Sequence, residues 1–151
     1  MASPDQALEN SNKWFTDGKF FDKLSSLVNI VTDSKNAVSV DDLTSYYTDG
    51  LSDILTDLGL QTEIIDNPIK DGPPFLIGKR IESSEFKTIL LYGHGDTVPL
   101  QEGQWFEGII PNELKIIDKK IYGRGVADNK GQHLINLLAL LSVLKIRKKH
   151  P

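Results

Sequence analysis

Two short loops carry the residues that could do chemistry in this chain of 151 residues. The first, residues 93–99, contains His94 and Asp96 and directly follows the apolar run 88–92. Side chains two positions apart in extended backbone lie on the same side. A metal-bound imidazole commonly donates its other N–H to a carboxylate. The pattern therefore suits a metal ligand, His94, oriented by Asp96, although glycine, aspartate, threonine and proline here are also typical of a plain turn.

The second loop, residues 122–131, leads into the last helical segment and contains Asp128. A carboxylate at a helix start is stabilised by the unpaired N–H groups there, so Asp128 is either an N-cap or a functional acid. The loop lacks the Gly-Lys-Ser/Thr ending of a phosphate loop and the third glycine of a dinucleotide fingerprint. We expect Arg124 to hold the loop by bonding backbone carbonyls or a nearby acid, the alternative being a substrate carboxylate. We expect Trp105 to anchor the loop between the two motifs, the alternative being a platform for substrate.

Helical periodicity predicts the elements that must position these loops. Apolar residues at helical spacing predict a first helix over about 15–32 and a second over 40–58, with Ser39 as a capping residue and Gly59 as the stop. A last helix begins near 129–131. Its expected buried stripe consists of leucines at helical spacing, namely Leu134, Leu137, Leu138, Leu141 and Leu144.

Strand-like runs occupy the middle of the chain. They cover residues 62–65, 75–81 and 88–92, and a further short strand or a hairpin is expected around 115–122 with a turn at 118–120. The continuous apolar run 88–92 is typical of a central strand covered on both faces. The predicted class is α/β, with a central, mostly parallel or mixed sheet flanked by helices. The polar residues 1–12 are expected to form a flexible arm, and residues 13–151 a single domain.

Composition excludes several classes of function. The net charge is −4, which disfavours a nucleic-acid binder, and there are no cysteines for disulfides or thiolate metal sites. The start of the chain lacks the pattern of a signal peptide, and the longest apolar region, 134–146, is too short to span a bilayer. We therefore expect a cytoplasmic location, with no membrane and no nucleic acid as partner.

Taken together, the two loops resemble the M20 family of zinc metallopeptidases and amidohydrolases, which includes aminoacylase-type, deacetylase, desuccinylase and carboxypeptidase members. The resemblance runs from about residue 88 to 144 and rests on Leu-Leu-Tyr-Gly-His-Gly-Asp-Thr-Val-Pro, on Trp105, and on Ile-Tyr-Gly-Arg-Gly-Val-Ala-Asp-Asn-Lys-Gly-Gln. It implies that His94 is a ligand of one zinc ion, that Asp128 bridges two zinc ions, and that Asp96 is the active-site carboxylate beside His94. It also implies a cis peptide bond between Asp128 and Asn129.

The same resemblance implies hydrolysis of an amide bond in a small N-acyl amino acid or short peptide. Manganese or cobalt would also suit the ligands, and the full-length enzyme could be a homodimer. The family's paired glutamates follow the Asp-x-Lys-Gly segment, whereas no glutamate follows Glu113 here. We therefore expect the N-terminal part of an incomplete zinc-peptidase-like catalytic domain, inactive alone and prone to associate. The alternative is a non-catalytic α/β binding or assembly module that retains the metal-site loops.

Overall fold

The computed structural model describes residues 3–33, 40–70 and 72–148. The predicted capping residue Ser39 lies outside these ranges. The helices are α1 (Pro4–Thr16), α2 (Lys19–Asn29), α3 (Val40–Ser45), α4 (Ser52–Asp57) and α5 (Lys130–Arg147), with a π-helical turn η1 (Tyr46–Leu51) between α3 and α4. The strands are β1 (Gln61–Ile65), β2 (Phe75–Lys79), β3 (Lys115–Ile117) and β4 (Lys120–Tyr122).

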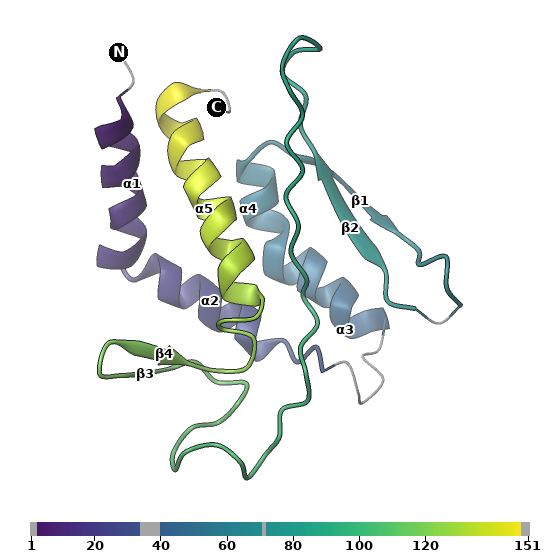
Figure 1. The fold of residues 1–151 in the computed structure, drawn as a ribbon, viewed down its shortest axis with the longest axis vertical. Coiled ribbons are helices and arrows are strands. Elements are labelled where there is room, and N and C mark those ends of the chain that lie inside the picture. The colour runs from purple at the N-terminus through teal and green to yellow at the C-terminus, as the bar shows by residue number, and fades with distance from the viewer. Residues whose placement is uncertain (1–2, 34–39, 71, 149–151) are drawn as a thin grey trace.

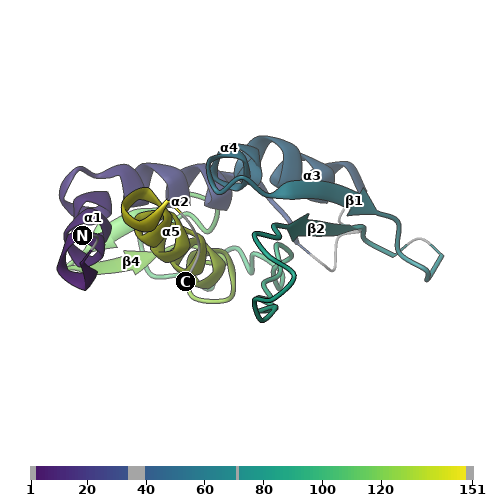
Figure 2. The same cartoon turned by 90° about the horizontal axis from the view of Figure 1, so that it is seen from above.

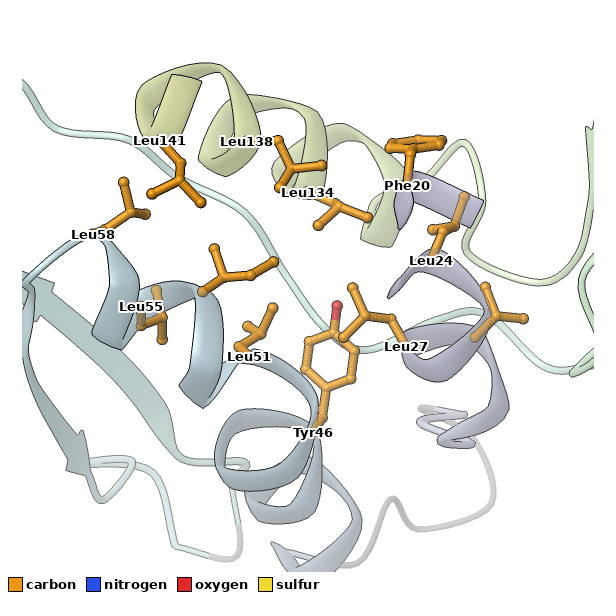
Figure 3. Packing of buried hydrophobic residues seen from close by; sticks show 12 residues of the cluster. Phe20, Leu24, Leu27, Tyr46, Leu51, Leu55, Leu58, Leu134, Leu138 and Leu141 are labelled. Atoms are coloured by element: carbon orange, nitrogen blue, oxygen red, sulfur yellow. The ribbon is translucent and has the colours of Figure 1, made fainter. Parts of the chain in front are cut away.

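The hydrophobic core lies between helices. In Figure 1, α5 runs between α1 and α4, and α5 also contacts α2. The side chains that meet there come from α2, from η1 and α4, and from the buried stripe of α5 (Figure 3). Leu27, Leu58 and Leu134 are completely buried, and each such side chain contributes about 1.5–3 kcal/mol relative to exposure. The leucine stripe predicted for the last helix therefore faces the core.

The N-terminal segment is helical where a flexible arm was expected. The Ser3 side chain accepts a hydrogen bond from the Gln6 N–H and the Gln6 side chain accepts one from the Ser3 N–H, which forms a capping box, and Pro4 occupies the first turn. α1 packs against both α2 and α5. The first predicted helix, 15–32, is consequently divided: α1 ends at Thr16, a turn through Gly18 follows, and α2 carries the apolar residues.

The second predicted helix forms, with a π-helical turn in its middle. At Gly50 the backbone approaches Leu27 of α2 so closely that an added Cβ would lie 3.0 Å from a leucine methyl carbon. The helix ends as predicted at Gly59, which adopts a positive φ of 66°. The N–H groups of Gly59 and Leu60 bond back to the Thr56 and Leu55 carbonyls, the pattern of a glycine-terminated helix.

The sheets differ from the central sheet that the sequence predicts. β1 and β2 pair antiparallel with Gln61 opposite Lys79, and β3 and β4 pair antiparallel with Lys115 opposite Tyr122. The turn of the second hairpin lies at Asp118 and Lys119, as predicted, and both residues have positive φ. Within the described ranges each sheet has two strands, and the parallel pairing is a single bridge between Asp33 and Thr97.

The predicted central strand at residues 88–92 does not form in the structure. They run extended, without a sheet partner, past α5 and β2 (Figures 1 and 2). Ile89, Leu90 and Tyr92 are 71%, 92% and 80% exposed. A strand needs a neighbour to satisfy its backbone N–H and C=O groups, and none of the described segments supplies one here.

No helix in the described part of the chain has the length and apolar character needed to cross a membrane.

Candidate metal centre

The two loops singled out from sequence meet in space. The Nε2 atom of His94 lies 3.0 Å from an Oδ1 atom of Asp128, although the residues are 34 positions apart. Asp128 stands two residues before α5, and the peptide bond between Asp128 and Asn129 is cis, which confirms that prediction. The structure therefore brings together the two side chains predicted as metal ligands.

The segment after α2 holds the His94 loop from one side. The Thr32 hydroxyl donates a hydrogen bond of 2.6 Å to the Gly95 carbonyl, and the Thr97 N–H donates one of 2.8 Å to the Thr32 carbonyl. Thr32 and Thr97 are both buried. Since buried hydrogen bonds do not compete with water, this part of the loop has a defined backbone path.

Lys130 holds the Asp128 loop against the end of α2. Its buried ammonium donates to the carbonyls of Leu27 and Ile30, at 2.9 and 2.6 Å, and lies 4.9 Å from the centre of the Tyr46 ring. These carbonyls are at the negative end of the α2 dipole, where a cation is stabilised. Burial lowers the pKa of Lys130 to about 8.

Asp96 contacts the other nitrogen of the His94 ring. Nδ1 of His94 lies 3.0 Å from the Asp96 carbonyl oxygen and 3.2 Å from its Oδ1 atom. Burial opposes protonation of His94, but the hydrogen bonds to Asp96 and Asp128 and the charges of both carboxylates outweigh it and raise the pKa of the imidazole. Nδ1 therefore faces Asp96 and Nε2 faces Asp128.

The donor set fits part of a zinc site. Two ligand atoms of a tetrahedral zinc ion, each about 2.0–2.2 Å from it, lie about 3.3–3.6 Å apart. The His94–Asp128 distance of 3.0 Å is a few tenths of an ångström shorter, so a small separation of the two side chains would admit the ion. The Asp128 side chain is 81% exposed, so its second oxygen is accessible to another ion. The described residues contain no group of three or more histidine, cysteine or acidic side chains able to hold a metal.

Two neighbouring residues of the loops have the supporting roles expected from sequence. Arg124 donates to the Leu100 carbonyl at 3.2 Å, and the Trp105 indole N–H donates to the same carbonyl at 2.7 Å. The Arg124 guanidinium lies 5.1 Å from the centre of the Trp105 ring. Arg124 and Trp105 therefore fix the loop between the two motifs at the Leu100 carbonyl.

Sequence reasoning missed Tyr46 and His133. Neither residue is singled out from the sequence, yet the Tyr46 hydroxyl lies 2.6 Å from Nε2 of His133. Burial, and then the nearby charges of His94 and Lys130, lower the pKa of His133 to about 4, and burial raises the pKa of Tyr46. Both groups are therefore uncharged near neutral pH. The residues stand 87 positions apart, so no local pattern could have paired them.

Comparisons with known proteins point to one family. Residues 90–151 match the sequence profile described as peptidase family M20/M25/M40. The chain is 34% identical over 99 residues to an acetylornithine deacetylase from Vibrio campbellii. It is 39% identical over 90 residues to a cysteinylglycine-S-conjugate dipeptidase from Corynebacterium striatum, and 35% identical over 105 residues to a Beta-Ala-His dipeptidase from Mus musculus.

The similarity covers most of this chain and little of each relative. The three alignments cover 66%, 59% and 62% of the chain, but 22%, 19% and 21% of the relatives. The chain thus spans about a fifth of the length of the curated relatives that it matches. The matched segment contains both loops of the candidate metal centre.

Proposed function

We propose that this chain, α1 included, is the N-terminal portion of the catalytic domain of a zinc-dependent hydrolase. Its residues 90–151 match the profile of peptidase family M20/M25/M40. The observation that carries the proposal is the 3.0 Å approach of His94 Nε2 to Asp128 Oδ1. Two potential ligands from separate loops converge there, and the Asp96 carboxylate lies beside the other nitrogen of the His94 ring.

Each site residue has a proposed role. His94 would hold one zinc ion through Nε2, and Asp128, whose carboxylate is exposed, would hold the same ion and a second one. The Asp96 carbonyl accepts from Nδ1–H, and its carboxylate lies 3.2 Å from the same nitrogen, so that Asp96 fixes the orientation of the His94 ring. The ions supply polarisation of the scissile carbonyl and a bound water of lowered pKa, and manganese or cobalt would suit the same ligands.

The chain supplies only part of the machinery for amide hydrolysis. Proton transfer from the attacking water to the leaving amine needs a general base, and no glutamate follows Glu113. A catalytic zinc ion also wants three protein ligands, whereas His94 and Asp128 provide two. We therefore infer that the isolated chain binds zinc weakly and does not turn over substrate, and that a longer protein completes the site.

The substrate is proposed to be an N-acyl amino acid or a short peptide. This class unites the names of the relatives, a deacetylase of an acetylated amino acid and two dipeptidases. In the same longer protein, the exposed apolar run 88–92 becomes a strand of a central sheet, since the run already is extended and lacks only a partner. A cytoplasmic location and a homodimer complete the proposal.

The test compares the isolated chain with the longer protein that contains it. Hydrolysis of N-acetyl amino acids and dipeptides is measured with zinc, after chelation, and after zinc is restored. We expect activity from the longer protein alone, reversible loss on chelation, and loss to background for His94→Ala and Asp128→Ala. Zinc-dependent turnover by the isolated chain, or full activity of either variant, contradicts the proposal.

One observation favours a second function. The described residues offer two metal ligands and no cluster of three, which is what a binding or assembly module that retains the loops would show. Such a module is distinguished by a complete protein that ends with this chain and has no hydrolase activity.

A further inference from the structure

Tyr46 and His133 join the middle of the chain to its last helix beside the candidate metal centre. Tyr46 is completely buried in η1, His133 lies in the first turns of α5, and the hydroxyl and Nε2 are 2.6 Å apart. Nδ1 of His133 lies 3.1 Å from Oδ1 of Asn129, the residue that follows Asp128. The same Asn129 oxygen lies 3.1 Å from the backbone nitrogen of His94.

The direction of every hydrogen bond in this chain of contacts follows from one fixed donor. The backbone N–H of His94 can only donate, so Oδ1 of Asn129 is an acceptor, and its amide nitrogen donates to Gln132 at 2.7 Å. His133 must then donate from Nδ1–H to that oxygen. Its neutral ring accepts at Nε2, where the Tyr46 hydroxyl donates.

The same two side chains occupy the space on either side of His94. A Cβ added to Gly93 would lie 2.6 Å from Cβ of His133, and one added to Gly95 would lie 2.6 Å from Cδ1 of Tyr46. Any larger residue at either position would therefore overlap a side chain. The backbone of residues 93–95 rests against Tyr46 and His133, and the Thr32 hydroxyl holds Gly95 from its carbonyl.

We propose that Tyr46, His133 and Asn129 form a positioning network for His94, acting through the His94 backbone N–H and through the space beside Gly93 and Gly95. None of the three is placed here as a ligand of the metal. The network sets where His94 stands relative to Asp128, because Asn129 belongs to the Asp128 loop and its side chain bonds the His94 loop. Its value for hydrolysis rests on the proposed function, whereas its presence in the isolated chain does not.

The experiment uses matched tyrosines in the isolated chain. Tyr46→Phe keeps the ring beside Gly95 and removes the hydroxyl that donates to His133. Tyr47→Phe removes the neighbouring hydroxyl, which donates to the Pro74 carbonyl outside the network. Amide hydrogen exchange is followed by NMR at His94 and, as a reference for global unfolding, at Leu138 in α5, together with the ring-nitrogen resonances of His94.

We expect Tyr46→Phe to speed exchange at His94 relative to Leu138 by roughly five- to tenfold, the factor for loss of one hydrogen bond, and to shift the His94 ring resonances. Tyr47→Phe should change neither. Equal acceleration at His94 and Leu138 in Tyr46→Phe, with unmoved ring resonances, would mean a general packing role and would overturn the proposal.

A second measurement needs no variant. Heteronuclear NMR of the unmodified chain near neutral pH should show His133 as the neutral tautomer protonated on Nδ1, and a ring protonated on Nε2 overturns the proposal. Neither measurement requires metal or substrate. An inactive longer protein would therefore count against the proposed hydrolase and leave the network standing. An active longer protein in which these NMR measurements fail would overturn the network and leave the hydrolase standing.

Discussion

At the residue scale, the imidazole of His94 lies between two carboxylates, and each contact has a different consequence. Asp128 lies beside Nε2, the nitrogen that would bind a metal, while Asp96 lies beside Nδ1. A carboxylate on Nδ1 selects the tautomer with a free Nε2 lone pair and makes that nitrogen a better donor. The two acids therefore contact different nitrogens of one ring.

The role of Asp96 predicts a loss of metal affinity when its charge is removed. Asp96→Asn keeps an oxygen that accepts from Nδ1–H and loses the negative charge. In the longer protein we expect zinc affinity to fall about tenfold, the lower end of the range for partners that orient a metal-bound histidine. Competition with a chelator measures it. Asp118→Asn, in the exposed hairpin turn, is the control, and equal affinities of the two variants would refute the role.

Burial of His133 predicts a loss of stability in mild acid. Its pKa is about 4 in the folded chain, against about 6.5 when unfolded, so the unfolded chain binds the proton first as pH falls. Between pH 6.5 and 4, protonation of this group lowers the free energy of unfolding by about 1.4 kcal/mol per pH unit. Above pH 6.5 the contribution of His133 to stability is fully present.

Two measurements check this acid sensitivity. An NMR titration of the His133 ring should have its midpoint well below that of an unfolded peptide, and urea unfolding at several pH values should show the loss. His133→Gln removes the titrating group and should flatten the dependence by about one proton. A His133 midpoint at its ordinary value would contradict the prediction.

At the scale of elements, α5 connects the core to the site. Its first turns carry Lys130 and His133, and its later turns carry the leucines that pack on α2 and α4. The start of the helix is held by the buried ammonium of Lys130 on the end of α2. Packing of α5 and placement of Asp128 are therefore parts of one arrangement.

Adjacent residues of α5 predict opposite responses to truncation. Leu134 is 0% exposed and Ile135 is 52% exposed. Leu134→Ala should lower the free energy of unfolding by about 2–5 kcal/mol, because it leaves a cavity in the core. Ile135→Ala should change it by less than about 1 kcal/mol. Urea denaturation of both variants decides the matter, and similar losses would show that the face of α5 is assigned incorrectly.

At the scale of the whole molecule, the middle of the chain exposes much apolar surface. Large apolar side chains are exposed on both strands of the first hairpin and along the extended run beside it, namely Ile64, Ile65, Phe75, Ile77, Ile89, Leu90, Leu91 and Tyr92. Exposed apolar surface and backbone without a sheet partner both favour association.

The exposed run predicts that the isolated chain associates. Sedimentation velocity should show a weight-average mass that rises with concentration. Leu90→Lys, at a position 92% exposed, should reduce that rise without loss of stability, whereas Leu8→Lys, 63% exposed on α1, should leave it unchanged. A chain that stays monomeric and melts independently of concentration would contradict the prediction.

The sequence by itself determined the local elements and the two chemical loops. Apolar spacing located the leucine stripe of α5 and the hydrophobic face of α2, Gly59 marked a helix end, and the turn residues located the second hairpin. The glycines, histidine and aspartates singled out the site, and the family resemblance predicted the cis bond after Asp128. These features depend on neighbours within a few residues, which periodicity and turn chemistry record.

Only the tertiary structure decided which distant residues come into contact. It placed Nε2 of His94 beside Asp128, put Tyr46 against His133, and anchored Lys130 on the carbonyls of α2. It also left residues 88–92 without a partner, although their apolar pattern is that of a buried strand. A run of apolar residues records the tendency to be buried, but pairing requires a second segment, and contacts between distant segments are not written in local spacing.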